Sequence, residues 1–146
     1  MIEFVKGDIF TTDFEVIAHG CNCAGGFGAG IAAVIARIHP NARSEYLKKF
    51  KKEGWTPGQV QMVAIGNNKF IANCGTQKHY LPRGRDLFEY EAFKDVCKTL
   101  KKHCLEKNLR LALPKIGAGL AGGDWNRILK IMEEELDGVV VRIYEL

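Results

Sequence analysis

The chain has 146 residues, of which 47% are hydrophobic and 26% are charged, and its formal net charge is +4 at pH 7. This length and composition are typical of a globular protein, so we expect residues 1–146 to form a single domain. No apolar stretch approaches the ~20 residues of a membrane-spanning helix, and the N-terminus lacks the pattern of a secretory signal. We therefore expect a cytoplasmic monomer that does not bind membranes.

The five cysteines are an odd number, which does not suit a disulfide framework. Cys21 with Cys23, or His103 with Cys104, could begin a zinc site, but no second pair follows at zinc-like spacing. We therefore expect reduced thiols, no metal and no bound cofactor.

Strand and helix patterns alternate along the chain. In chain order, the predicted elements are a strand at Ile2–Val5, a strand at Phe14–Ala18, helices at Ile31–Ile38 and Ala42–Lys52, a hairpin of Val60–Ile65 and Phe70–Cys74, a helix at Asp86–Lys107, a strand at Leu109–Leu113, a helix at Trp125–Leu136 and a strand at Val139–Tyr144. This alternation predicts an α/β fold in which a mixed sheet is covered by helices on both faces.

Nine of the sixteen glycines lie in two short windows, residues 19–30 and 115–124. Each window follows an apolar strand pattern and leads into a helix. A strand, a glycine loop and a helix N-terminus together form an anion site, because glycine allows close approach and backbone N–H groups point inward. Ligands in such sheets bind beyond the carboxyl ends of the strands. The two loops could therefore hold one diphosphate from both sides.

The glycines do not follow the two common nucleotide-binding patterns. Gly26-x-Gly28-x-Gly30 differs by one residue from the Rossmann fingerprint, and no acidic residue ends a second strand about twenty residues later. Neither loop is followed by the Gly-Lys-Ser/Thr of a Walker motif. These departures argue against hydride transfer and against a kinase.

Five segments together carry a family resemblance. They are Lys6-Gly7-Asp8-Ile9, Gly20-Cys21-Asn22, Gly28-Ala29-Gly30-Ile31-Ala32, Pro114-Lys115-Ile116-Gly117-Ala118-Gly119-Leu120 and Val141-Arg142-Ile143-Tyr144. With them the whole chain resembles the macro domain family, which binds ADP-ribose. It looks nearest to the small single-domain branch of ADP-ribose 1″-phosphate phosphatases and terminal ADP-ribose glycohydrolases. The resemblance implies a three-layer α-β-α fold with a mixed six-stranded sheet.

The resemblance also implies ligand contacts. Asp8 should accept a hydrogen bond from the adenine N6 amine, the Ile9 amide should reach the ring, Tyr144 should stack on adenine, and Asn22 should contact the distal ribose. The residues expected to hold the diphosphate through their backbone amides are Gly28, Ala29, Gly30, Ile31, Gly117, Ala118, Gly119 and Leu120. From the residues alone, Asp8 equally fits a turn, Asn22 an ordinary loop and Tyr144 the core.

By the same resemblance, His19 and Asp124 match the catalytic pair of the phosphatase branch. Imidazole can act as a nucleophile or as an acid and base near neutral pH. Either His19 attacks phosphorus or it orients a water, with Asp124 as the partner in proton transfer. From the residues alone, His19 also fits a hydrogen-bonded structural histidine, and Asp124 also fits a helix N-cap.

We expect a metal-free phosphatase that converts ADP-ribose 1″-phosphate to ADP-ribose and phosphate. One alternative is a hydrolase that releases ADP-ribose from proteins or nucleic acid, using Asp124 or Lys78. The other is a non-catalytic reader of ADP-ribose or of ADP-ribosylated macromolecules. The glycohydrolase branch has a catalytic lysine and an Asp directly after Gly-x-Gly-Leu. Ala121 stands at that position here, which favours the phosphatase.

Overall fold

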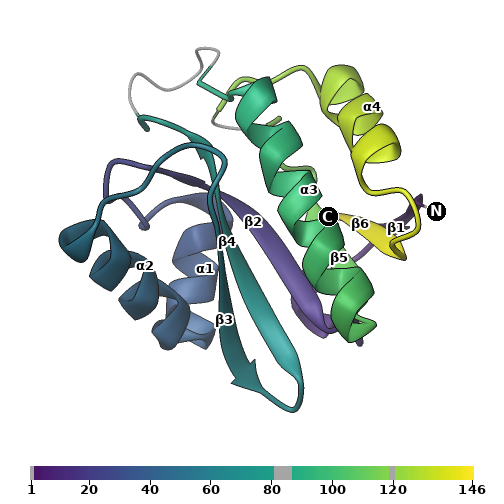
Figure 1. Cartoon of the computed structure of the whole chain (residues 1–146). Coiled ribbons are helices and arrows are strands. Elements are labelled where there is room, and N and C mark those ends of the chain that lie inside the picture. The colour runs from purple at the N-terminus through teal and green to yellow at the C-terminus, as the bar shows by residue number, and fades with distance from the viewer. Residues whose placement is uncertain (1, 81–86, 119–120) are drawn as a thin grey trace.

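The computed structural model describes residues 2–80, 87–118 and 121–146. It shows a six-stranded sheet between two pairs of helices, with α1 and α2 on one face and α3 and α4 on the other (Figure 1). The predicted α/β fold, with three layers of which the middle one is a mixed six-stranded sheet, is confirmed.

The elements differ from the predicted ranges mainly at their ends. The strands are β1 (Ile2–Lys6), β2 (Val16–Asn22), β3 (Val60–Gly66), β4 (Lys69–Gln77), β5 (Leu111–Pro114) and β6 (Val141–Glu145). The helices are α1 (Gly30–Ile38), α2 (Pro40–Lys52), α3 (Tyr90–Lys107), α4 (Trp125–Glu135) and the short 3₁₀ helix η1 (Ile9–Thr11). In the described part of the chain, no helix is long and apolar enough to cross a membrane.

The sheet order is β1-β6-β5-β2-β4-β3. Neighbouring strands are parallel, except that β3 and β4 form an antiparallel hairpin. The sheet is therefore mixed, as predicted. Because β2 is parallel to both of its neighbours, β4 and β5, the carboxyl ends of the three strands meet at one edge. The first glycine window starts within β2 and continues beyond this edge, and the second window follows β5 directly.

Strand alternation divides the core into two layers. On β2, Val16 and Ala18 belong to the cluster that packs with residues of α3 and α4, whereas Ile17 and Cys21 belong to the cluster that packs with residues of α1 and α2. Successive side chains on a strand point to opposite faces, so each residue of β2 has a fixed layer. This rule also decides where His19 points.

Two strands continue into segments that the sequence pattern assigned to loops. The predicted strand at Phe14–Ala18 extends to Asn22, and the predicted strand at Phe70–Cys74 extends to Gln77. The two extensions pair with each other, with Cys21 opposite Gly75 and Asn22 opposite Gln77. Cross-strand pairing therefore outweighs the low strand propensity of glycine.

Candidate ligand-binding groove

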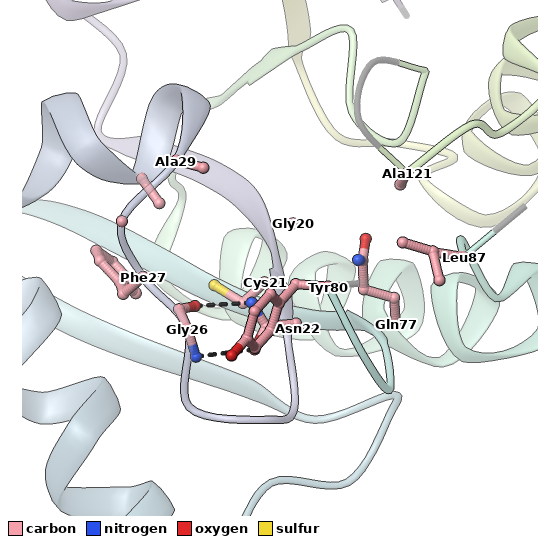
Figure 2. Close-up of a pocket in the computed structure, with 12 residues that line it drawn as sticks. Gly20, Cys21, Asn22, Gly26, Phe27, Ala29, Gln77, Tyr80, Leu87 and Ala121 are labelled. Carbon is pink, nitrogen blue, oxygen red and sulfur yellow. Dashed lines mark hydrogen bonds between the residues drawn. The ribbon is translucent and has the colours of Figure 1, made fainter. Parts of the chain in front are cut away.

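Three pockets join into one groove beyond the carboxyl ends of the strands. A pocket of about 380 Å³ contains Asp8 and Tyr144, and one of about 300 Å³ lies between the two glycine loops. A third, of about 310 Å³, contains Asn22 and Gln77 (Figure 2). Neighbouring pockets share lining residues, so they are continuous. The first and second share Gly30, Ile31, Pro114 and Lys115. The second and third share Gly20, Ala29, Gln77 and Ala121. We call the three parts the Asp8 end, the middle and the Asn22 end.

At the Asp8 end, Asp8 caps the short helix η1. Its Oδ1 accepts a hydrogen bond from the Phe10 N–H at 2.9 Å, and in the described part of the chain Oδ2 has no such partner. Ile9 and Tyr144 line the same pocket. Tyr144 is only 8% exposed, and its hydroxyl donates to Thr12 at 2.8 Å. Asp8 therefore serves the turn and also offers a carboxylate oxygen to the groove.

In the middle, the groove runs along the N-terminus of α1. Ala29 is the N-cap and makes no side-chain cap hydrogen bond. A Cβ added at Gly28 or Gly30 would meet no atom within 4 Å, so the space beside the backbone is open. Uncapped N–H groups at a helix N-terminus attract anions. Together with Ile31, these residues line the groove; their contact with a diphosphate stays a prediction.

Of the four residues of the second loop that are predicted to contact the ligand, the structure describes Gly117 and Ala118. Gly117 lines the middle of the groove, but a Cβ there would meet the Phe88 ring at 2.5 Å. Ala118, which was predicted to contact the ligand, lines none of the three pockets. Gly119 and Leu120, the other predicted contacts of this loop, lie outside the described residues. At Gly117, therefore, the loop is packed against the core.

At the Asn22 end, the Asn22 side chain holds its own loop together. Its Oδ1 accepts the N–H groups of Ala24 at 3.0 Å and Gly26 at 3.1 Å, and its Nδ2 donates to the Gly26 carbonyl at 2.7 Å. Figure 2 shows the two bonds between Asn22 and Gly26 at the wall of the pocket. The second N–H of the amide has no partner in the described part of the chain, so it is available to a ligand.

Sequence analysis assigned no role to Lys115, Gln77 or Tyr80. Lys115 lines the Asp8 end and the middle, and is the one cation that lines the groove among the described residues. Gln77 lines the middle and the Asn22 end, and Tyr80 packs over Gly26. The signal for Lys115 was its place at the start of the second loop, directly after the apolar strand. The place of Gln77 in the groove could not be predicted from the sequence, because it depends on the pairing of the extended β4 with Asn22.

The placement of His19 corrects the expectation that it points at the distal ribose. The ring is 0% exposed, lines none of the three pockets, and its Nε2 lies 2.6 Å from Asn73 Oδ1. Burial lowers the pKa of His19 to about 4, although the hydrogen bond to Asn73 opposes the shift. His19 is therefore a neutral histidine of the core at physiological pH.

Register explains why His19 is buried. It alternates with Ala18 and Gly20, so it shares the α1 and α2 face with Ile17 and Cys21. Asn73 is its partner on β4 in the sheet register and is also 0% exposed. His19 therefore lies in the middle of β2, and the Phe27 ring packs edge-on against it with 5.4 Å between ring centroids, so its side chain does not reach the edge of the sheet.

Asp124 also occupies a structural position. It is the N-cap of α4, and its Oδ1 accepts the Asn126 N–H at 3.0 Å. Its backbone N–H donates to the Tyr90 hydroxyl at 2.9 Å. It lines none of the three pockets. The structure therefore does not bring His19 and Asp124 together in the groove, and their catalytic role stays a prediction without geometric support.

Other candidate reactive groups are also set apart from the groove or unreactive. The Lys78 side chain is exposed and lines none of the three pockets, whereas Ala121 lines two of them. Cys21 lines the Asn22 end, but burial raises the pKa of its thiol well above the usual value, and that of Cys23 to about 11. Both thiols therefore stay protonated at neutral pH. The described residues contain no group of three His, Cys, Asp or Glu that could hold a metal ion.

Residues 18–132 match the model of the Macro domain family. The chain belongs to the macro domain family. A protein of Meyerozyma guilliermondii named ADP-ribose 1″-phosphate phosphatase is 34% identical, over 98% of this chain and 97% of that protein. A Thermus aquaticus protein named DNA ADP-ribosyl glycohydrolase is 29% identical over 99% of this chain, which spans only 41% of that protein's length.

Solved structures agree with this assignment. The macrodomain of Thermus aquaticus DarG superposes on this macro domain with a TM-score of 0.84 at 27% identity, covering 100% of this chain and 99% of that one. The named relatives are hydrolases of ADP-ribose derivatives. They differ in the bond that their names say they cleave, so the particular reaction is argued separately.

Proposed function

We propose that this macro domain binds ADP-ribose along the groove and hydrolyses ADP-ribose 1″-phosphate. The observation that carries the proposal is the continuity of the three pockets, which offer different chemistry in the order that ADP-ribose requires. A carboxylate stands at the Asp8 end, uncapped backbone N–H groups and Lys115 lie in the middle, and side-chain amides lie at the Asn22 end.

Each part of the groove suits one part of the ligand. Asp8 Oδ2 would accept a hydrogen bond from the adenine N6 amine. Guanine has a carbonyl at this position, and a carboxylate would repel it. The N-terminus of α1 would hold the diphosphate through its N–H groups, with the Lys115 ammonium adding charge. Asn22 and Gln77 would donate hydrogen bonds to the distal ribose and the 1″-phosphate.

The hydrolytic step would rest on positioning. In this step a water oxygen bonds to phosphorus, the bond from phosphorus to the C1″ oxygen breaks, and the proton that the water gives up ends on that leaving oxygen. Among the described residues no carboxylate, histidine or lysine lines the Asn22 end. Amide and hydroxyl groups of Asn22, Gln77 and Tyr80 would hold the phosphate in line with water, which makes orientation the main contribution to rate.

The phosphatase proposal is supported by relatives of matching length. The Meyerozyma guilliermondii protein and a Lodderomyces elongisporus protein, both named ADP-ribose 1″-phosphate phosphatase, are each 97% covered by this chain. Removal of ADP-ribose from a macromolecule is a weaker candidate. Its lysine mechanism would need Lys78 in the groove and an acid at Ala121, and neither condition is met.

A non-catalytic reader is the second candidate. The observation that favours it is the lack of a charged side chain among the described residues that line the Asn22 end, together with the burial of His19. Such a pocket can bind a neutral ribose without supplying an acid or a base. Binding would then be the whole function of the groove.

Calorimetric titration followed by a phosphate-release assay tests the proposal. ADP-ribose should bind with micromolar affinity, about −8 kcal/mol, and GDP-mannose should not compete. Phosphate should be released from ADP-ribose 1″-phosphate, and Lys78→Ala should not change the rate. Binding without phosphate release would make the protein a reader. Release of ADP-ribose from modified protein or nucleic acid, lost in Lys78→Ala, would make it a glycohydrolase.

A further inference from the structure

We infer that Tyr46 is a positioning residue that sets the affinity of the groove for the distal ribose by fixing the loop of residues 22–26. The inference rests on the proposed function, because it concerns the Asn22 end of the same groove. Tyr46 lies on α2, is 0% exposed and lines none of the three pockets. It therefore cannot touch the ligand and can act only through the loop.

Every hydrogen bond of the Tyr46 hydroxyl goes to this loop in the described structure. The hydroxyl lies 2.8 Å from the Asn22 carbonyl oxygen and 3.0 Å from Asn22 Oδ1, so it donates its one proton toward these two acceptors. It accepts the Gly25 N–H at 3.1 Å. One buried hydroxyl thus joins both ends of the turn and the amide side chain that the ligand would meet.

The Tyr46 ring is itself held rigidly. It stacks on Trp55 with 5.2 Å between ring centroids, and it packs at 5.0 Å against Phe27, which lines the groove. The Trp55 indole N–H donates to the Tyr46 carbonyl at 3.1 Å. These contacts hold the ring, and with it the hydroxyl, in place beside the loop.

The loop depends on such support because its turn is made by glycines. Gly25 has a φ of +89°, and a Cβ there would meet the Phe50 ring at 2.9 Å. Asn22 Oδ1 accepts both the Ala24 and Gly26 N–H groups, so rotation of the Asn22 amide would break the turn. By holding Oδ1, Tyr46 fixes which way the Asn22 Nδ2 donor points. Orientation of that donor would decide how well a ribose hydroxyl is bound.

Comparison of two ligands separates this effect from a general loss of structure. ADP carries the adenine and the diphosphate but lacks the distal ribose. In Tyr46→Phe, the affinity for ADP-ribose should fall about tenfold, the scale of a hydrogen-bond loss, while the affinity for ADP should stay unchanged. Calorimetry on the folded proteins gives both values, with circular dichroism and a thermal midpoint as the check on folding.

Tyr90→Phe is the matched control. The Tyr90 hydroxyl also accepts a hydrogen bond from a glycine loop, because the backbone N–H of Asp124 donates to it at 2.9 Å. This is the second glycine loop, which leads into α4 and not into α1. Its removal should leave the ratio of the ADP-ribose and ADP affinities unchanged. An equal loss of both affinities in Tyr46→Phe would mean that the hydroxyl serves the fold alone.

A double-mutant cycle with Asn22→Ala tests whether Tyr46 acts through Asn22. If it does, the double variant should bind ADP-ribose no more weakly than Asn22→Ala alone, because coupled residues are not additive. Multiplied losses, or an unchanged ADP-ribose affinity in Tyr46→Phe, would overturn the inference.

If Tyr46→Phe does not fold, Asn22→Asp keeps the Oδ1 acceptor and removes the Nδ2 donor. It should then lower the affinity for ADP-ribose and spare that for ADP, and equal losses would again overturn the inference. A wild-type protein that binds no ADP-ribose would instead refute the proposed function.

Discussion

The two glycine loops look alike in sequence, but Gly28 of the first loop and Gly117 of the second differ in the space that they leave for a side chain. In the first loop, a Cβ at Gly28 would extend into open space, and α1 begins without a side-chain cap. In the second loop, a Cβ at Gly117 would meet Phe88, and α4 is capped by Asp124. The first helix N-terminus is therefore open to a ligand, whereas the second is satisfied by the protein itself. Glycine can mark room for a ligand or close packing of the core, and only the neighbouring atoms distinguish the two.

The largest effect that this comparison predicts is on stability, in Gly117→Ala. Gly117 has a φ of +79°, and the added Cβ would lie 2.5 Å from the Phe88 ring. Backbone strain and overpacking together should lower the free energy of unfolding by about 3 kcal/mol. Urea unfolding measures the change. A stability equal to that of the wild type would mean that this loop is as open as the first.

Gly28→Val should have the opposite outcome. The side chain would occupy the groove, where nothing lies within 4 Å of the added Cβ. We expect ADP-ribose affinity to fall about 100-fold, or about 2.7 kcal/mol, with an unchanged thermal midpoint. Calorimetry and thermal unfolding give the two values. Retained affinity would show that the diphosphate lies elsewhere, and a large loss of stability would remove the contrast with Gly117.

The strand that leads into the first loop contributes a pH dependence. The folded pKa of His19, about 4, is below the ordinary value of 6.5, so the unfolded state binds more protons between these values. This contribution to stability is therefore complete above pH 6.5 and should fall by about 2.5 kcal/mol as the pH drops from 7.5 to 4.5. Glu15, with its pKa lowered to about 2 mainly by its hydrogen bond to Arg110, loses stabilisation only below pH 4.5. In His19→Gln the dependence in this window should flatten, and an unchanged slope in urea unfolding would contradict the assignment.

Much of the fold could be predicted because its signals are local. The inward residues of α3 follow helical periodicity, and Phe93, Val96 and Leu100 are buried as their spacing indicates. The hairpin of β3 and β4 was predicted from the Gly66-Asn67-Asn68 turn, where both asparagines have positive φ. Such signals come from residues close together in the sequence, so the elements can be predicted without knowledge of distant contacts.

The groove could be predicted only in part, because its residues depend on neighbours from other elements. The role of His19 turned on which face of β2 it shares, and that face is set by pairing with Asn73. The sequence places Tyr46 on the apolar face of a predicted helix, and nothing local indicates that its hydroxyl reaches Asn22. The roles of residues that contact other helices or strands therefore could not be predicted from the sequence.

Asp8 sharpens the comparison at the scale of a single hydrogen bond. Asp8→Ala removes the carboxylate at one end of the groove, so affinities for ADP-ribose and ADP should both fall about tenfold, the scale of a hydrogen bond to a charged group. Asp8→Asn is the matched variant, since its amide oxygen can still accept the Phe10 N–H. Loss in both variants would assign the effect to the Oδ2 acceptor rather than to the turn, because in Asp8→Asn an NH2 donor takes the place of Oδ2. Affinity retained in Asp8→Ala would remove the adenine assignment.

The smallest predicted effect is that of Asp124→Ala, although Asp124 and Asp8 make the same local bond. Each carboxylate accepts the N–H two residues later, at 3.0 Å and 2.9 Å, but only Asp8 lines the groove. Loss of the N-cap of α4 should lower the free energy of unfolding by about 1 kcal/mol. ADP-ribose affinity and the rate of phosphate release should remain at the wild-type level, as calorimetry and a phosphate assay would show. A fall in kcat of about 100-fold or more, the scale of losing an acid or base, would restore Asp124 to catalysis. It would also show that the second loop moves toward the ligand in the working enzyme, and the difference between the loops would then belong to the free state alone.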